Sequence, residues 1–320
     1  MKKQIIAAAV AATMTTVALA DVSISGAAQI NWTHQETTTT KATGIDQNMD
    51  LKVVGKSGDT TAVMDFEVTN DSADSATTAS TGTKIKNAYL TTKVGDVTVE
   101  GGTKYGADTL LDDAGVTDRY VTLSTAVGPA TVHYKQWTDD NGTAAADATN
   151  DHSEYGVKAT FGDITVYHEQ ETDADHNATQ VTGNVAGINL YYRNEDANGT
   201  SLDKDALQLD YTMGGVKLTY AKVDAEVGTK SDAFFGTWTT ATAASTSLKE
   251  ADGFGVTTDL AGNTVQLRSY TTKSGASGAS DVDHTKIIVT RALASGATAE
   301  VTYHDDETTE TLDVELRIKF

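Results

Sequence analysis

The side chains best able to do chemistry in this chain are its 7 histidines and several short acidic clusters. None of the histidines stands in a recognisable nucleophile or zinc pattern; they are His34, His133, His152, His168, His176, His284 and His304. The stretch Asp173–Asn177 has calcium-like spacing, but Ala178 stands where a calcium loop needs Gly, and no Glu occupies the twelfth position. We therefore predict no enzyme activity, no cofactor and no resident metal, with at most loose binding of divalent cations at acidic loops.

The last ten residues, 311–320, indicate the elements that must position any functional side chain. Apolar residues alternate with charged ones: Leu312, Val314, Leu316, Ile318 and Phe320 against Asp313, Glu315, Arg317 and Lys319. A period of two indicates an extended strand with one apolar and one charged face. Such a strand would be an adhesive edge in a soluble protein, whereas in a closed membrane barrel its apolar face meets lipid and its charged face meets water.

Turn signals divide the chain into strands of similar length. Short turns are expected at Gly55–Gly58, Gly95–Asp96, Gly128–Pro129, Gly162–Asp163, Ala186–Gly187, Gly214–Gly215, Ala261–Gly262 and Ala294–Gly296. Longer polar loops are expected at 36–45, 70–82, 103–118, 139–152, 173–177, 195–204, 225–250, 273–282 and 305–310. Eight turns and nine loops separate eighteen strands, and sixteen is the alternative if the pair within 178–194 is overcounted. The pattern predicts an all-β transmembrane antiparallel barrel.

Alternation within these strands assigns residues to the two faces. Strand 83–94 and strand 284–293 are ambiguous, because Lys86 and Arg291 disagree with their apolar neighbours. Aromatic residues near strand ends are expected on the lipid face, as in an aromatic girdle: Trp32, Tyr134, Trp137, Tyr155, Tyr192, Tyr211, Tyr220 and Tyr303. The Thr- and Ala-rich stretches 70–83 and 231–247 are expected to be surface loops.

The first twenty residues predict export. Lys2 and Lys3 precede an apolar run that ends in Ala18-Leu19-Ala20, which indicates a signal peptide over 1–20 and a single domain over 21–320. The formal net charge is −21, and removal of the two lysines makes it −23. This charge favours cations and disfavours nucleic acid as a partner, although acidic solvated loops would give the same total.

The C-terminal residues Leu316, Ile318 and Phe320 resemble the assembly signal of Gram-negative outer-membrane general-diffusion porins, the trimeric bacterial porins. The segment from Tyr89 to Asp118 also resembles that family, although Lys104 stands where the family commonly has Arg. The resemblance implies that the third loop, 103–118, folds into the lumen and forms a constriction from Lys104, Asp108, Asp112, Asp113 and Asp118. An ordinary solvated outer loop is the alternative.

Porins of this kind place basic residues opposite such a loop. By alternation, the inward candidates are Lys135, Lys158, Arg193, Lys217, Arg268 and Arg317. Opposed charges across a water-filled gap would filter solutes by charge and orientation. Each of these residues could instead pair with an acidic neighbour and hold strand register.

These observations predict a passive, cation-preferring channel for ions and small hydrophilic solutes in the cell outer membrane. The resemblance implies a homotrimer, and the expected partners are outer-membrane lipid, lipopolysaccharide and the barrel-assembly machinery. A substrate-specific channel is one alternative, and its expected sign would be rows of aromatic residues along the lumen. A secreted, non-conducting adhesin or surface protein is the other.

Overall fold

The computed structural model describes residues 21–72, 80–105, 117–139, 151–172, 176–197, 203–225, 229–232, 234–239, 249–273 and 281–320. These residues form strands joined by turns. The strands are β1 (Asp21–Thr37), β2 (Lys41–Ser57), β3 (Thr60–Ser72), β4 (Ser80–Val94), β5 (Val97–Tyr105), β6 (Thr117–Val127), β7 (Ala130–Asp139), β8 (Asp151–Phe161), β9 (Ile164–Glu171), β10 (His176–Val185), β11 (Ile188–Ala197), β12 (Lys204–Met213), β13 (Val216–Ala225), β14 (Thr229–Asp232), β15 (Gly236–Thr239), β16 (Lys249–Leu260), β17 (Asn263–Lys273), β18 (Val282–Ala292), β19 (Ala297–Asp305) and β20 (Thr309–Lys319). The predicted signal peptide, 1–20, lies outside the described residues.

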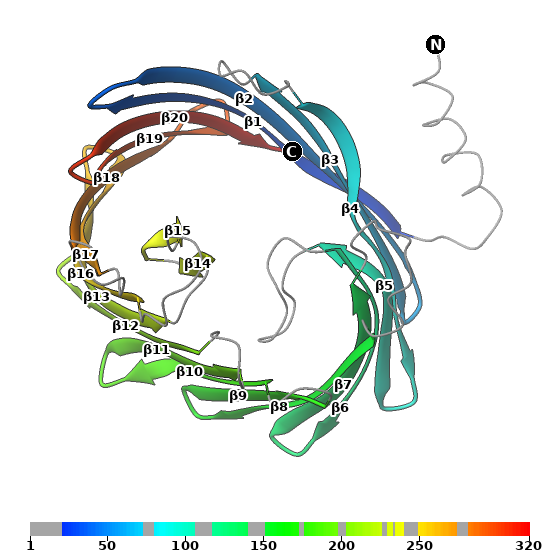
Figure 1. Ribbon diagram of the computed structural model, residues 1–320. Coiled ribbons are helices and arrows are strands. Elements are labelled where there is room, and N and C mark those ends of the chain that lie inside the picture. The colour runs from blue at the N-terminus through cyan, green and yellow to red at the C-terminus, as the bar shows by residue number, and fades with distance from the viewer. Residues whose placement is uncertain are drawn as a thin grey trace, which may run out of the picture.

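Eighteen of these strands form one closed antiparallel sheet, which Figure 1 shows as a ring. Each strand pairs with its neighbour in the chain, β13 pairs with β16, and β1 pairs with β20 to close the barrel. The predicted count of eighteen is confirmed, and the alternative of sixteen is wrong. The pair within 178–194 consists of β10 and β11, which hydrogen-bond over ten residue pairs.

All eight predicted short turns join strands at one end of the barrel, here called the turn end. Several place Gly in the left-handed region, for example Gly95 at φ 63° and Gly128 at φ 60°. At the opposite, loop end, two of the expected long loops are much shorter than predicted. β1 continues to Thr37 and β2 begins at Lys41, while β19 and β20 leave only residues 306–308 between them. Thr, Glu and Lys extend these strands past the apolar region, so polar composition alone was a poor guide to their ends.

The two faces of the wall have opposite character. Large apolar side chains such as Ile24, Phe161 and Met213 are more than half exposed on the outside. On the inside, Lys135 and Glu154 are almost completely buried among neighbours. This inversion of a soluble core is expected where the outside solvent is lipid and the inside is wet. A barrel of eighteen strands encloses a lumen that is too wide to be filled by the side chains of its wall alone.

One girdle residue was assigned to the wrong face. Trp137 shares its face with Lys135, lies below the Lys135 ammonium at 5.1 Å, and is 7% exposed. It therefore points inward, whereas Tyr134 and Tyr155 of the same predicted girdle are exposed on the outside. A Trp flanked by polar residues at a strand end fits either face by composition, so only the alternation with Lys135 could have placed it.

A β-bulge explains the ambiguous strand 83–94. The register between β3 and β4 shifts so that Asp65 pairs with Asn87 while Phe66 pairs with Ile85, which leaves Lys86 as the extra residue. Lys86 then reaches inward to Glu67, with Nζ 2.7 Å from Oε1. The alternation breaks because the strand contains one residue more than its partner.

The C-terminal residue takes part in closing the barrel. Phe320 donates a backbone hydrogen bond to Gly26 at 3.0 Å and accepts one from it at 2.8 Å. Its ring lies over Gly26, where an added Cβ would approach Phe320 Cζ to 2.7 Å. Among the described residues, no helix is long and apolar enough to cross a membrane.

Candidate functional site: the inner wall and an inward hairpin

Lysines and aromatic rings alternate along the inner face of β4 to β9. Lys104 Nζ lies 4.8 Å from the ring centre of Tyr89 and 5.1 Å from that of Tyr120. Lys135 Nζ lies 5.6 Å from the ring centre of Tyr120 and 5.1 Å from that of Trp137. We call these five residues, with Lys158 and Tyr167, the lysine–aromatic wall. Rings that face cations in a partly desolvated setting help to hold them in place.

Glu100 fixes one end of this wall. Its carboxylate accepts hydrogen bonds from Lys104 Nζ at 2.6 Å, from Tyr120 Oη at 2.7 Å and from Thr91 Oγ1 at 2.7 Å. The glutamate thus orients both a cation and one of the rings that the cation faces. Because register places Thr91 and Tyr120 on the strands at either side of β5, the sheet itself sets this geometry.

The adjacent part of the wall contains two buried carboxylates. Glu154 and Glu169 are 0% exposed, and His133 Nε2 lies 3.8 Å from Glu154 Oε1 and 3.1 Å from Glu169 Oε1. These three residues come from β7, β8 and β9, where register sets His133 beside Gly156 and Gly156 beside Glu169. The Tyr167 hydroxyl donates a short hydrogen bond to Glu169. Sequence alone gave no sign of this cluster, because its members lie on three strands.

A short hairpin lies inside the ring of strands. β14 and β15 belong to the connection between β13 and β16, and Figure 1 shows them within the ring of strands. Phe234 and Phe235 at the tip are each 5% exposed and pack in a cluster with Ala221, Ala251 and Tyr270 of the wall. The prediction of a surface loop over 231–247 is therefore wrong for residues 234 and 235.

Small residues of the wall make room for these rings. An added Cβ at Gly255 would lie 2.9 Å from Phe234 Cε2. The neighbouring inward positions Ala221 and Ala251 are each 1% exposed beneath the hairpin. The sequence signal for this docking site was available: an apolar Phe234-Phe235 pair in a polar loop, opposite strands whose inward positions are Ala and Gly.

Two side chains of β17 attach the hairpin by polar contacts. Arg268 stacks on Phe234, with its guanidinium carbon 5.2 Å from the ring centre, and donates a short hydrogen bond to the Phe234 carbonyl. Tyr270 Oη lies 3.5 Å from the Phe235 carbonyl and stacks on His284, with ring centres 4.5 Å apart. We call Phe234, Phe235 and the wall residues they contact the hairpin dock.

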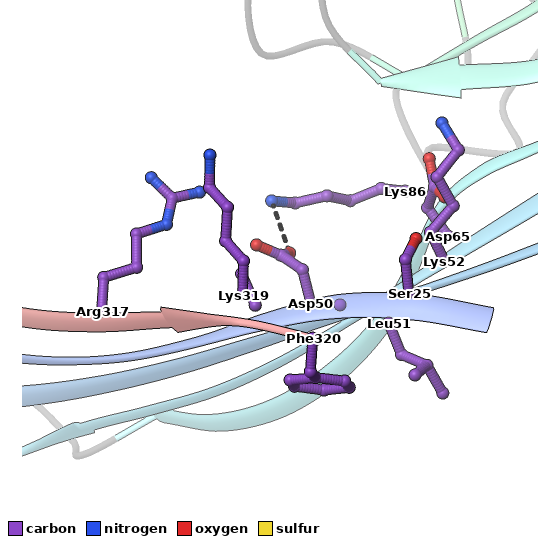
Figure 2. Close-up of a pocket in the computed structure, with 11 residues that line it drawn as sticks. Ser25, Asp50, Leu51, Lys52, Asp65, Lys86, Arg317, Lys319 and Phe320 are labelled. Carbon is purple, nitrogen blue, oxygen red and sulfur yellow. Dashed lines mark hydrogen bonds and ion pairs between the residues drawn. The ribbon is translucent and has the colours of Figure 1, made fainter. Parts of the chain in front are cut away.

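A further charged recess lies beside the C-terminus, with a volume of about 450 Å³. Figure 2 shows Arg317, Lys319 and Asp50 on one side of the strands, and Phe320 and Leu51 pointing to the other. Its cations Lys52, Lys86, Arg317 and Lys319 outnumber its carboxylates Asp50 and Asp65. The predicted division of the last strand into a charged and an apolar face is confirmed.

The six basic candidates occupy separate parts of the inner face. Lys135 and Lys158 lie in the lysine–aromatic wall, Arg268 in the hairpin dock and Arg317 in the charged recess. Arg193 pairs with Glu195 at 2.8 Å, and Lys217 Nζ lies 3.9 Å from Asp210. The structure therefore does not gather them into a single row, and their part in a constriction stays a prediction.

The acidic third loop cannot be placed, because Asp108, Asp112 and Asp113 lie outside the described residues. The ends of the predicted loop belong to strands. Lys104 lies in β5 and Asp118 in β6, and the two are paired in register.

No family model matches this sequence, and no curated protein matches it. Solved structures do match its fold, a closed antiparallel barrel of eighteen strands, and a porin is among them. A BenF-like porin from Pseudomonas fluorescens Pf-5 is 10% identical, with a TM-score of 0.68, over 94% of this chain and 98% of its own.

Two further solved structures show the same likeness. Pseudomonas aeruginosa OccK2 (OpdF) in complex with glucuronate is 14% identical, with a TM-score of 0.67, over 94% of this chain and 98% of that one. Acinetobacter baumannii OccAB1 is 12% identical, with a TM-score of 0.62, over 94% and 96%. At these identities the likeness establishes the barrel fold alone. It does not support the general-diffusion class of porins that the sequence resemblance implies.

Proposed function

We propose that this chain is a passive, water-filled channel through which ions and small hydrophilic solutes cross the outer membrane. One observation carries the proposal: a closed barrel of eighteen strands is apolar outside and charged inside. Fixed charges of both signs along a wide lumen would replace part of the hydration of a passing solute. The apolar outer face supports insertion in a bilayer, and closure leaves no strand edge unpaired within it.

The location and assembly follow as parts of the same proposal. Export through a signal peptide at 1–20 would bring the chain to the outer membrane, where lipid and lipopolysaccharide surround it. Leu316 and Ile318 of β20, and Phe320 directly after it, are 41–59% exposed, which suits recognition by assembly machinery before insertion. A homotrimer is proposed from the family resemblance alone.

The test is solute permeation into liposomes that contain the refolded protein. Neutral sugars of increasing size should enter at rates that fall steeply with size, as expected for diffusion through a narrowed lumen. Liposomes with folded protein that admit no sugar would contradict the channel and favour a non-conducting surface protein.

We further propose cation preference, on the basis of the formal net charge of −21 and the acidic third loop. Attraction of cations to a negatively charged channel should move the zero-current potential in a KCl gradient toward the K⁺ value. Substitution of Asp112→Asn with Asp113→Asn should weaken this preference. Anion preference in the unmodified protein would overturn it.

A substrate-specific channel for acidic solutes is the second candidate, and the lysine–aromatic wall favours it. Lys104 and Lys135 face rings on the inner wall, and Lys135 is almost fully buried, so an anion that reached it would meet a poorly hydrated cation. Lumen-facing aromatics were the expected sign of such a channel. The solved OccK2 complex with glucuronate supports the choice of that sugar acid as a probe.

Titration of glucuronate against single-channel current separates the two candidates. Saturable block that weakens in Lys104→Gln would support a specific site. A current that is independent of glucuronate would contradict the substrate-specific channel and agree with the general one. The matched control is Lys41→Gln, because Lys41 is exposed and pairs with Glu36 at the edge of the barrel.

A further inference from the structure

We propose that His133, Glu154 and Glu169 form a binding site for a divalent metal ion of the zinc type on the inner wall. This proposal does not depend on channel activity. The sequence shows no metal-binding pattern here, because the three residues lie on three different strands, β7, β8 and β9.

The geometry suits one small ion. One ligand atom from each residue can be chosen so that all lie within 4.8 Å of one another. Zinc bonds to nitrogen and oxygen are about 2.0–2.2 Å long, so ligand atoms around a tetrahedral ion are separated by about 3.3–3.6 Å. The two measured separations, 3.1 Å and 3.8 Å from His133 Nε2, bracket that range.

The carboxylate of Glu154 provides an independent reason to expect a ligand. It is 0% exposed, and neither of its oxygens has a hydrogen-bond partner among the described residues. Lys135, its register partner on β7, holds Nζ over the rings of Tyr120 and Trp137. Glu154 pairs with His133, whose Nε2 at 3.8 Å is too distant for a hydrogen bond. A buried carboxylate without hydrogen bonds is costly, and a bound cation would reduce that cost.

The surroundings hold the other two ligands in position. Tyr167 donates to Glu169 and packs edge-on against His133, with ring centres 5.8 Å apart. Gly156 leaves the space that the His133 ring occupies, because an added Cβ there would overlap His133 Cε1. Contacts of this kind orient metal ligands and raise affinity.

The chemistry of the ligands indicates the class of metal. An imidazole nitrogen with two carboxylate oxygens matches three-ligand zinc sites, which leave one position for water or solute. Calcium and magnesium prefer all-oxygen sites, so the histidine disfavours them. The ion would reach the site from the lumen, since the cluster lies on the inner face.

The experiment is a titration of the refolded, metal-stripped barrel with Zn²⁺ in competition with a chromophoric chelator. We expect one ion per chain, and an affinity at least about tenfold lower in Glu154→Gln and in His133→Gln. Gly156→Ala should also weaken binding, although it keeps all three ligands. The matched control His34→Gln should leave the affinity unchanged, because His34 lies on another strand and contacts Thr43.

Two further measurements distinguish the loss of a metal ligand from misfolding of the variant. Heat-modifiable mobility on a gel reports whether each variant is folded, and saturating Zn²⁺ should raise the Tm of the unmodified protein but not of folded Glu154→Gln. The proposal is overturned if the unmodified barrel binds no Zn²⁺, or if folded Glu154→Gln binds it equally well.

Discussion

The lysine–aromatic wall and the hairpin dock use the same inward positions of the sheet in opposite ways. On the lysine–aromatic wall, large and charged side chains such as Lys135 and Trp137 fill the inner face. At the hairpin dock, the inward wall residues Ala221, Ala251 and Gly255 are small. The Phe234 ring, which comes from a loop, fills the space above them. The lumen is therefore shaped on one side by the strands and on the other by an inserted segment.

We therefore expect the lysine–aromatic wall to determine ion preference and the hairpin to narrow the lumen. Changes to the lysine–aromatic wall should alter which ions pass, whereas changes to the hairpin dock should alter how much passes.

The largest effect is expected from Phe234→Ala combined with Phe235→Ala. Loss of each buried ring costs about 3–5 kcal/mol of docking free energy, so the hairpin should leave the wall. Single-channel conductance should rise while the ion preference stays nearly constant. Phe254→Ala is the control, since Phe254 is 65% exposed on the outer face of the same wall. Unchanged conductance in the double variant would show that the hairpin does not narrow the conducting path.

The second largest effect, on ion preference, is expected from Lys135→Met. This change deletes a buried cation that faces two rings, with a cation–π contribution of about 2 kcal/mol at a desolvated site. Zero-current potentials in a KCl gradient should shift toward cation preference, and conductance should change little. If Lys135→Met and the exposed Lys41→Met give the same potential, the lysine–aromatic wall does not select ions.

A smaller effect is expected from Gly255→Ala. The new methyl would crowd Phe234 Cε2, at a cost of about 1 kcal/mol, near the lower end for overpacking. Conductance should become noisier as the hairpin undocks transiently. Gly44→Ala is the matched control, because nothing lies within 4 Å of its added Cβ. Equal traces from both variants would contradict the packing of Phe234 on Gly255.

The smallest effect is expected at Asp306, in the turn between β19 and β20. Although partial burial favours its neutral form, hydrogen bonds from Thr308 and Thr309 hold its pKa below the ordinary 3.8. Its stabilisation is therefore complete above pH 3.8 and is lost as the pH falls through the lowered pKa. Asp306→Ala should cost no more than about 1 kcal/mol at neutral pH, and nothing in strong acid. A pH-independent loss in chemical unfolding would show that the charge is not involved.

The sheet was predictable from the sequence because its determinants are local. Alternation in 311–320 fixed the two faces of β20, and glycines with positive φ marked the short turns, so the strand count followed. The alternation failed at Lys86, where a bulge adds a residue. Trp137 was misplaced for a different reason: the girdle pattern put it on the lipid face, although alternation with Lys135 puts it on the inner face.

The candidate site was less predictable because its contacts join distant strands. His133, Glu154 and Glu169 meet only through the register of β7, β8 and β9. The hairpin dock brings together residues as far apart in the sequence as Ala221 and Tyr270, whereas the family resemblance implies the third loop as the inward segment. An apolar pair within a polar loop was the one local signal for the inward hairpin.

Channel activity is tested most directly by the conductance of the refolded, heat-modifiable protein in a planar bilayer. Stepwise current increases that persist at constant voltage are predicted, since a closed, internally charged barrel should conduct ions without a gating ligand. Folded protein that inserts in the bilayer but carries no current would show that this barrel is not an open channel.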